Sequence, residues 1–189
     1  MSGVRGMHGC VAATPLEQLT SNLDAPLVVV TATNGRQRGG CVVGFHCQCS
    51  VEPGRFAIWL SKANHTFRVG WQADRFAIHF LTEADHDIAE VFGTNTGDEI
   101  DKFALSQWHP GDGGVPLLDA CPNRFVGRRI ALLDEGSDHV CIVVEPIEIS
   151  FAGPFRPLRH SQVQDLDPGH ATEDRPRPAT LAEGAPSSR

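Results

Sequence analysis

The run Leu27–Thr33, LVVVTAT, ends directly at Asn34-Gly35, and this junction constrains the fold more than any other part of the chain. A β-branched run predicts a strand, and Asn-Gly is a dipeptide that tight hairpin turns prefer. We therefore expect the chain to turn back into a second strand, from about Gly39 to Val51. The sequence thus predicts an antiparallel sheet.

More strands than helices follow, and the helices are short. Further strands are expected at about Phe56–Leu60, Phe76–Leu81, Asn123–Leu133 and His139–Ser150. Short helices are expected at Pro15–Leu23, from Asn64 or Thr66 to about Ala73, and after the Thr82/Asp85 capping pair, with another turn or two at Asp98–Ala104. Because strands do not alternate with long helices, a parallel doubly wound sheet is disfavoured. The prediction is a mainly β (α+β) fold, a small antiparallel barrel with short peripheral helices.

Size and composition limit the class of protein. The 189 residues predict one domain, 15–164, between a flexible N-terminus, 1–14, and a disordered C-terminal tail, 165–189, that is poor in large apolar residues. A formal net charge of -7, without a Lys/Arg-dense run, argues against a nucleic-acid partner. No apolar stretch reaches the roughly 18–20 residues of a membrane helix, and MSGVRGMHGC lacks the apolar core of a secretory signal. We expect a cytoplasmic protein with no membrane partner.

The cysteines are expected to be free thiols, because no export signal precedes them. They are Cys10, Cys41, Cys47, Cys49, Cys121 and Cys141. A metal site at Cys47-x-Cys49, with His46 or His139 nearby, is the alternative to buried core thiols. In a regular strand His46 faces away from both cysteines, and no second Cys/His pair stands at zinc spacing. Core cysteines and no metal are therefore predicted.

Alternation along the expected strand Gly39–Val51 places Gly44, His46, Gln48 and Ser50 on one face. Small and hydrogen-bonding side chains do not suit a dry core. This face is therefore either exposed to solvent or the wall of a ligand site, and the segment alone leaves both readings open.

Ser61, Lys62, Asn64 and Thr66 stand where a strand is expected to end and a helix to begin. Free backbone N–H groups, hydroxyls, an amide and an ammonium at such a place can bind a phosphate. Simple helix capping by Asn64 or Thr66 explains the same residues.

Two histidines lie in strand-like segments. His79, within FAIHFL, is expected to be hydrogen-bonded in the interior. His139, which follows Ser137-Asp138, is expected at a rim, where it either meets a ligand or pins a hairpin. G-x-S-x-G, G-x-G-x-x-G and P-loop motifs are all absent from the sequence.

Taken in order, these segments resemble the flavin reductase-like family of FMN-binding split barrels, over roughly Leu27 to Ser150. LVVVTATNG matches the opening strand and hairpin. VVGFHCQCSVEPG stands where the family has G-x-T-x-N-[AS]-F-x-S-V-S-x-D-P-P, and Ser61–Thr66 stands where it has the Ser-x-x-x-x-Thr loop for the FMN phosphate. FAIHFL, Asp101-Lys102-Phe103, GVPLL and Ser137-Asp138-His139 follow in the family's order.

The resemblance implies an antiparallel FMN-binding split β-barrel and a flavin reductase that transfers hydride from NAD(P)H to flavin. It also implies a homodimer, and it allows a partner monooxygenase. His139 would be the catalytic residue, positioning the nicotinamide or supporting the pyrimidine edge of the flavin. The phosphate would be held by Ser61, Lys62, Asn64 and Thr66, and the isoalloxazine bordered by Val43, Gly44, His46, Gln48, Cys49 and Ser50.

The chain departs from the family pattern at the expected wall. Val42 or Val43 and Gly44 replace the family's Thr and Asn, Gln48 replaces its first Ser, and Gly54 replaces its second Pro. FAD or a deazaflavin therefore remains an alternative to FMN. The alternative functions are a flavin- or deazaflavin-dependent oxidoreductase acting on another small substrate, and a non-catalytic flavin- or haem-binding split barrel. The sequence does not distinguish NADH from NADPH.

Overall fold

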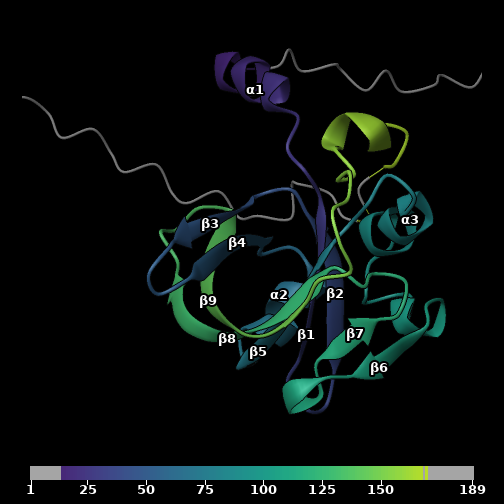
Figure 1. Cartoon of the computed structure of the whole chain (residues 1–189). Helices are drawn as coiled ribbons and strands as arrows, with labels where there is room; N and C mark the ends of the chain where they lie inside the picture. Colours follow the sequence, from purple (N-terminus) through teal and green to yellow (C-terminus); the bar gives the residue numbers. More distant parts are fainter. Residues whose placement is uncertain (1–13, 168, 170–189) are drawn as a thin grey trace, which may run out of the picture.

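In the computed structural model, which describes residues 14–167 and 169, seven strands form one antiparallel sheet that curls into an open barrel (Figure 1). The strands are β1 (Val28–Thr33), β2 (Arg38–Val43), β3 (His46–Ser50), β4 (Arg55–Ser61), β5 (Arg75–Phe80), β8 (Arg124–Leu133) and β9 (His139–Ser150). Their order across the sheet is β2-β1-β5-β8-β9-β4-β3. The predicted mainly β, antiparallel barrel is confirmed.

Short elements surround this sheet. β6 (Trp108–Pro110) and β7 (Pro116–Leu118) form a separate small hairpin. The helices are α1 (Pro15–Thr20), α2 (His65–Gly70) and α3 (His86–Thr94), and the 3-10 turns are η1 (Ser21–Leu23), η2 (Lys102–Ala104), η3 (Asp112–Gly114) and η4 (His160–Val163). Asn64 caps α2 by accepting a hydrogen bond from the Thr66 N–H at 3.0 Å. The predicted helices are present, although α2 ends three residues before Ala73.

The single predicted strand Gly39–Val51 is wrong. β2 ends at Val43, the chain crosses at Gly44-Phe45, and β3 begins at His46 on the opposite edge of the strand order. The alternation that put Gly44 on the same face as Ser50 therefore breaks at the crossing. The Phe45 carbonyl accepts a hydrogen bond from the Trp59 N–H at 2.9 Å, which fixes the crossing against β4.

The crossing also changes where the cysteines lie. Cys41, in β2, is buried in the barrel core, whereas Cys47 and Cys49, in β3, are exposed. The prediction of buried thiols is thus wrong for Cys47 and Cys49. All five cysteines within the described residues are free, as expected, and Cys10 lies outside those residues.

Strand β1 is buried on both of its faces and contributes to two cores. Val28, Val30 and Ala32 belong to the barrel core, whose other members include Ile58 and Ile142. Val29 faces the other way, into a second core beneath α3 with Phe92, Leu118 and Leu158 among its members. A strand buried on both faces needs an almost continuous apolar run, which Leu27–Ala32 supplies; the one polar residue, Thr31, donates its hydroxyl to the Pro116 carbonyl.

The segment after β9 packs back onto the domain. The Leu158 N–H donates to the Leu81 carbonyl, the Leu27 N–H donates to the Leu158 carbonyl, and Leu166 packs against the second core. Contacts continue past the predicted boundary at residue 164, because the Gly169 N–H donates to the Gly93 carbonyl at 3.0 Å. The remainder of the predicted tail, and residues 1–13 of the predicted N-terminus, lie outside the described residues.

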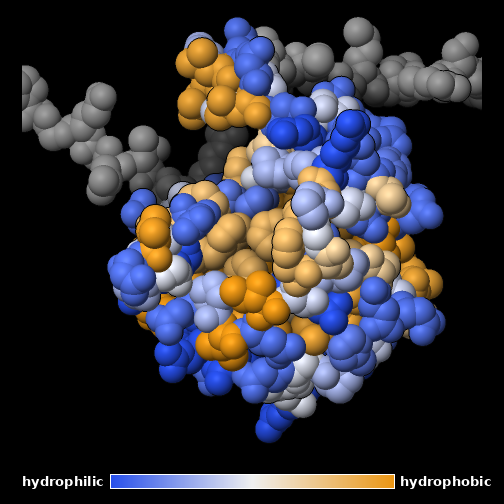
Figure 2. Space-filling model, viewed as in Figure 1, coloured by the Kyte–Doolittle hydropathy of each residue, from blue (hydrophilic) through white to orange (hydrophobic). Residues whose placement is uncertain are grey.

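α1 stands apart from the sheet (Figure 1) and buries none of its side chains. Leu16, Leu19 and Leu23 of α1 and η1 are exposed, and the helix at the top of Figure 2 presents apolar atoms to solvent. The helix is defined locally, because Thr14 and Glu17 form a capping box and Pro15 occupies the first turn.

His79 is hydrogen-bonded in the interior, as predicted. Its Nε2 accepts from the Leu118 N–H at 3.1 Å, so the proton resides on Nδ1, 3.2 Å from the Val29 carbonyl oxygen. Burial lowers the pKa of His79 to about 3, with smaller effects from the Val29 hydrogen bond and from Arg124.

This low pKa predicts an acid-sensitive contribution to stability. Since the unfolded His79 titrates near pH 6.5, its contribution is complete above about pH 6.5 and declines towards pH 3, by up to about 1.4 kcal/mol per pH unit. Urea unfolding of the wild type and His79→Gln between pH 7 and pH 5 measures this. We expect the free energy of unfolding to fall more steeply for the wild type, and equal slopes would contradict the assignment.

Candidate functional site

A cavity of about 390 Å³ lies where the chain crosses from β2 to β3; we call it the His139 cavity. Its lining comes from the crossing, from β4 and the loop after it, from α3 and its end, from the start of β9 and from the segment after β9. The lining residues are Leu27, Cys41, Val42, Val43, Gly44, Phe45, Trp59, Leu60, Ser61, Asn64, Ala89, Phe92, Gly93, Asn95, Thr96, His139, His160, Val163, Leu166 and Asp167. The walls are therefore mostly apolar.

Polar groups gather at one side of this cavity. Ser61 and Asn64 come from the loop before α2, and Asn95 and Thr96 from the end of α3. An interaction just beyond them ties the two segments together, because His65 Nδ1 lies 2.9 Å from an Asp98 carboxylate oxygen. The result is a polar side of two hydroxyls and two amides from segments far apart in sequence. The Thr96 hydroxyl donates to Asp98 and the Asn95 amide to the Val91 carbonyl and the Thr94 hydroxyl, so Ser61 and Asn64 are the two that can donate hydrogen bonds to an anionic oxygen.

His139 lies directly opposite Ser61 in the β4–β9 pairing, so both side chains share one face. Its ring meets the Phe45 ring edge-on, with centroids 5.3 Å apart, and its Nδ1 is 3.2 Å from an Asp138 carboxylate oxygen. This holds the imidazole at the edge of the cavity, where it can contact a bound molecule.

Five of the eleven residues proposed from the sequence line the His139 cavity: Val43, Gly44, Ser61, Asn64 and His139. The others do not line it. His46 faces the barrel interior, stacked on Phe56 with its Nε2 3.0 Å from the Pro26 carbonyl oxygen. Gln48, Cys49 and Ser50 continue along β3, beyond the crossing.

Lys62 and Thr66 also point elsewhere. The Lys62 ammonium pairs with Asp134 at 2.5 Å, outside the cavity. Thr66 is buried behind the wall, where its hydroxyl lies beside the buried Cys41 thiol, and it does not line the cavity.

Several residues that line the His139 cavity were not predicted from the sequence. Asn95 and Thr96 follow the predicted helix without a motif, and only their polar character after an apolar helix face distinguishes them. Val163 and Leu166 are isolated apolar residues in a polar segment. Phe45 and Trp59 read as ordinary strand residues, and only the crossing brings them together.

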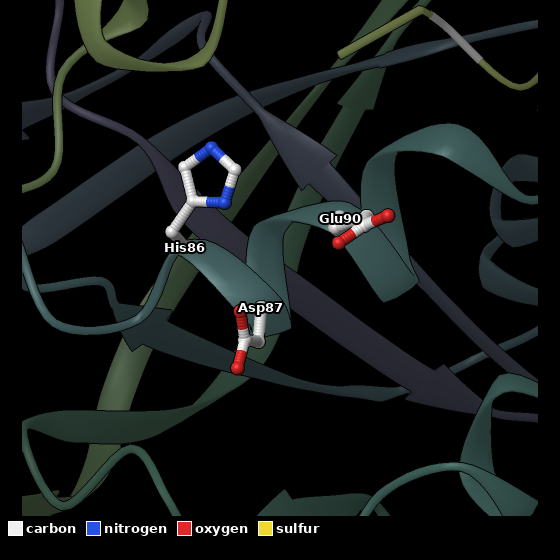
Figure 3. Close-up of side chains that lie close together, drawn as sticks. All are labelled: His86, Asp87 and Glu90. Atoms are coloured by element: carbon white, nitrogen blue, oxygen red, sulfur yellow. The ribbon is translucent and has the colours of Figure 1, made fainter. Parts of the chain in front are cut away.

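Within the described residues one group has side chains close enough to share a metal ion: His86, Asp87 and Glu90 on α3 (Figure 3). Asp87 and Glu90 are exposed, and His86 lies 3.4 Å from Asp165. None of the three lines the His139 cavity. The cluster is therefore a charged surface of α3, and we assign no metal to it.

No helix in the described part of the chain has the length and apolar character needed to span a membrane.

Comparison with known proteins gives a consistent result. The model of the flavin reductase like domain matches residues 20–164. The reductase subunit HsaB of a flavin-dependent monooxygenase from Mycobacterium tuberculosis is 30% identical over 122 residues, which is 61% of this chain and 63% of that protein. The NADH-dependent FMN reductase RutF of Stutzerimonas stutzeri is 25% identical over 105 residues, 56% of this chain and 60% of that protein. The chain thus matches less than two thirds of the length of either relative.

The fold is shared with solved structures. An FMN-binding protein from Thermus thermophilus superposes with a TM-score of 0.65 at 21% identity, over 79% of each chain. That protein was crystallised with 1-cyclohex-2-enone bound.

Proposed function

Because the chain belongs to the family of flavin reductase-like domains, we propose that it is a flavin reductase that binds FMN in the His139 cavity and reduces it with NAD(P)H. One observation carries this proposal. The cavity combines apolar walls with a polar side built from Ser61, Asn64, Asn95 and Thr96, and His139 stands at its edge. A planar ring with a phosphorylated side chain needs both environments.

The polar side suits the phosphate. The Asn95 amide donates to the Val91 carbonyl and the Thr94 hydroxyl, and the Thr96 hydroxyl donates to Asp98, so these two side chains shape the polar side without a proton left for the phosphate. Ser61 and Asn64 would donate directly. Lys62 would contribute only by leaving Asp134, and Thr66 only if its buried hydroxyl became accessible.

The apolar walls suit the ring. Val43, Phe45 and Trp59 exclude water, and Gly44 leaves the main chain open to the ligand at the position where the family has an asparagine side chain. The flavin, when bound, supplies the hydride-accepting chemistry. His139 would orient the nicotinamide or donate a hydrogen bond to the flavin pyrimidine edge, since its imidazole is held beside Phe45 and Asp138. Alignment of the two rings is the main contribution that such a site makes to the rate.

The names of the relatives extend the proposal to a partner. HsaB is the reductase subunit of a flavin-dependent monooxygenase, and the reductase component of the trigonelline monooxygenase of Acinetobacter baylyi is another relative. We propose by analogy that the reduced flavin serves a separate monooxygenase.

Purified protein tests the function directly. We expect the fluorescence of FMN to decrease when it binds to the protein. We expect NADH or NADPH to be oxidised only when FMN is added. A protein that retains flavin through gel filtration would instead support a flavoenzyme acting on another substrate. Saturating FMN without binding and without NAD(P)H oxidation would contradict the proposal.

Gly44 provides a test of the cavity itself. A Cβ added at Gly44 would meet only Leu27 Cδ2, at 3.6 Å, so Gly44→Leu fills the cavity without a backbone clash. We expect the FMN affinity to fall at least about tenfold, which is about 1.4 kcal/mol. Gly54→Leu is the matched control, because Gly54 lies in an exposed turn with only the Val51 carbonyl oxygen near, at 3.9 Å.

Both variants should keep melting temperatures within about 5 °C of the wild type, since neither site is crowded. Equal FMN affinity in Gly44→Leu and Gly54→Leu would place the ligand elsewhere.

We also propose that two copies associate through the outer face of the barrel beside the cavity. Directly paired residues share a face, so the strand registers place Cys47, Ala57, Trp59, Ala131, Leu133, Cys141 and Val143 together on the outer face of the sheet, with Ala57 covered by its neighbours. A solvated sheet face normally carries polar side chains, and an uncharged one marks an interface.

Light scattering tests this association. We expect twice the monomer mass for the wild type, and a monomer for Leu133→Asp, because Leu133 is 51% exposed on that face. Leu105→Asp, at a comparably exposed leucine after η2, should remain a dimer. A monomeric wild type would contradict the proposal.

A further inference from the structure

Among the described residues, no lysine or arginine lines the His139 cavity. Within that part of the chain its one carboxylate is that of Asp167, and its basic side chains are the imidazoles of His139 and His160. Tight phosphate sites use guanidinium or ammonium groups, because charge-assisted hydrogen bonds are about twice as strong as neutral ones. The lining of this cavity therefore suits a phosphate poorly.

The basic side chains on the elements around the cavity are engaged elsewhere. The Lys62 ammonium pairs with Asp134 at 2.5 Å, and the Arg68 guanidinium of α2 is bonded to Asp98. The Lys102 ammonium donates to two main-chain carbonyls, one in β2 and one in α3. None of these three cations lines the His139 cavity, so a phosphate bound there gains no direct cationic partner from them.

The loop between β4 and α2 pairs its main-chain donors within itself. The Ala63 N–H donates to the Ser61 hydroxyl at 3.4 Å, and the Asn64 N–H donates to the Ser61 carbonyl at 3.0 Å. The Thr66 N–H donates to the Asn64 side chain, and the Phe67 N–H donates to the Asn64 carbonyl at 3.1 Å. With these N–H groups occupied, the loop offers a ligand chiefly the Ser61 hydroxyl proton and the Asn64 amide.

Asp167 brings a negative charge to the same side of the cavity. The Gly169 N–H donates to the Gly93 carbonyl at 3.0 Å, and a Cβ built on Gly169 would lie 2.5 Å from the Thr94 carbonyl oxygen. The segment after β9 therefore runs against the end of α3, where Asn95 begins the polar side (Figure 1). Since two residues span at most about 7 Å, the Asp167 carboxylate stands near the place where a phosphate would bind and repels it.

The apolar walls can bind a flavin ring without help from a phosphate. Val43, Phe45, Trp59 and Leu166 supply apolar surface, and the Phe45 side chain is 64% exposed and free to be covered by a ligand. Burying a flat aromatic ring against such surface is favourable whatever group the ribityl chain carries.

We propose that the His139 cavity selects the isoalloxazine ring and gains little from the phosphate, so that riboflavin, which lacks the phosphate, is a substrate comparable with FMN. Asp167 is the residue that sets this specificity. The ring is identical in both flavins, so the reaction is unchanged: a hydride with its two electrons passes from the nicotinamide to the ring, and a proton from water completes the dihydroflavin. The inference rests on the proposed function, because it concerns the flavin bound in the same cavity.

Riboflavin and FMN are compared by equilibrium binding, followed through flavin fluorescence, and by steady-state oxidation of NADH and NADPH. We expect the two dissociation constants of the wild type to agree within about threefold, because two neutral hydrogen bonds to the phosphate are offset by the repulsion from Asp167. The KM values for the two flavins should agree to the same extent.

Asp167→Lys tests the residue itself. Asp167 is exposed, so this change leaves the fold intact, and an ammonium beside the polar side gives the phosphate a charge-assisted partner. We expect the ratio of the riboflavin to the FMN dissociation constant to rise at least about tenfold. Asp165→Lys is the matched control: it makes the same change of net charge at an exposed carboxylate that lies beside His86 and does not line the cavity. Its ratio should stay within about twofold of the wild type.

A wild type that binds FMN at least about tenfold more tightly than riboflavin would overturn this inference and leave the proposed function standing. Equal ratios in Asp167→Lys and Asp165→Lys would remove Asp167 as the determinant of specificity. A wild type that binds neither flavin would overturn both the inference and the proposed function.

Discussion

The two residues Gly44 and Phe45 impose the shape of the whole sheet. β2 and β3 occupy opposite ends of the strand order, yet only these two residues separate them in sequence. Since each residue spans at most about 3.6 Å, the sheet must curl until its two edges almost meet. The Trp59 N–H bond to the Phe45 carbonyl then fixes one edge at the crossing. The chain therefore joins the two sheet edges at Gly44-Phe45, while no ladder of hydrogen bonds pairs β2 with β3.

The functional surface follows from that opening. Where two sheet edges approach without full pairing, side chains rather than a strand must fill the space, and the His139 cavity lies there, between Val43, Phe45 and Trp59. The α3 helix and the segment after β9 cover what the strands leave open. The Lys102 ammonium bridges the Gly40 carbonyl of β2 and the Phe92 carbonyl of α3, so one buried cation holds a wall strand and a covering helix together.

Local patterns in the sequence predicted the elements better than their contacts. The Asn34-Gly35 hairpin and the buried His79 depend on short-range signals, and the family resemblance ordered the segments; the pairing of Ser61 with His139 emerged only from the sheet. The crossing at Gly44 escaped because hydrogen-bonding and apolar residues alternate through it without interruption. Asn95 and Thr96 escaped because they lie near Ser61 only in the folded chain, where the bonds of Asp98 to His65 and Arg68 join the two segments. Leu158 and Leu166 escaped because isolated apolar residues acquire a place only from tertiary contacts.

The contacts of the segment after β9 have a consequence for biosynthesis. The main-chain hydrogen bonds of Leu27, just before β1, and of Leu81, just after β5, form only with Leu158. Val163 and Leu166 form part of the cavity lining. A ribosome releases the N-terminal part of a chain first. The lining of the His139 cavity is thus completed only after almost the entire domain has emerged, so a nascent chain holds an unfinished cavity throughout most of its translation.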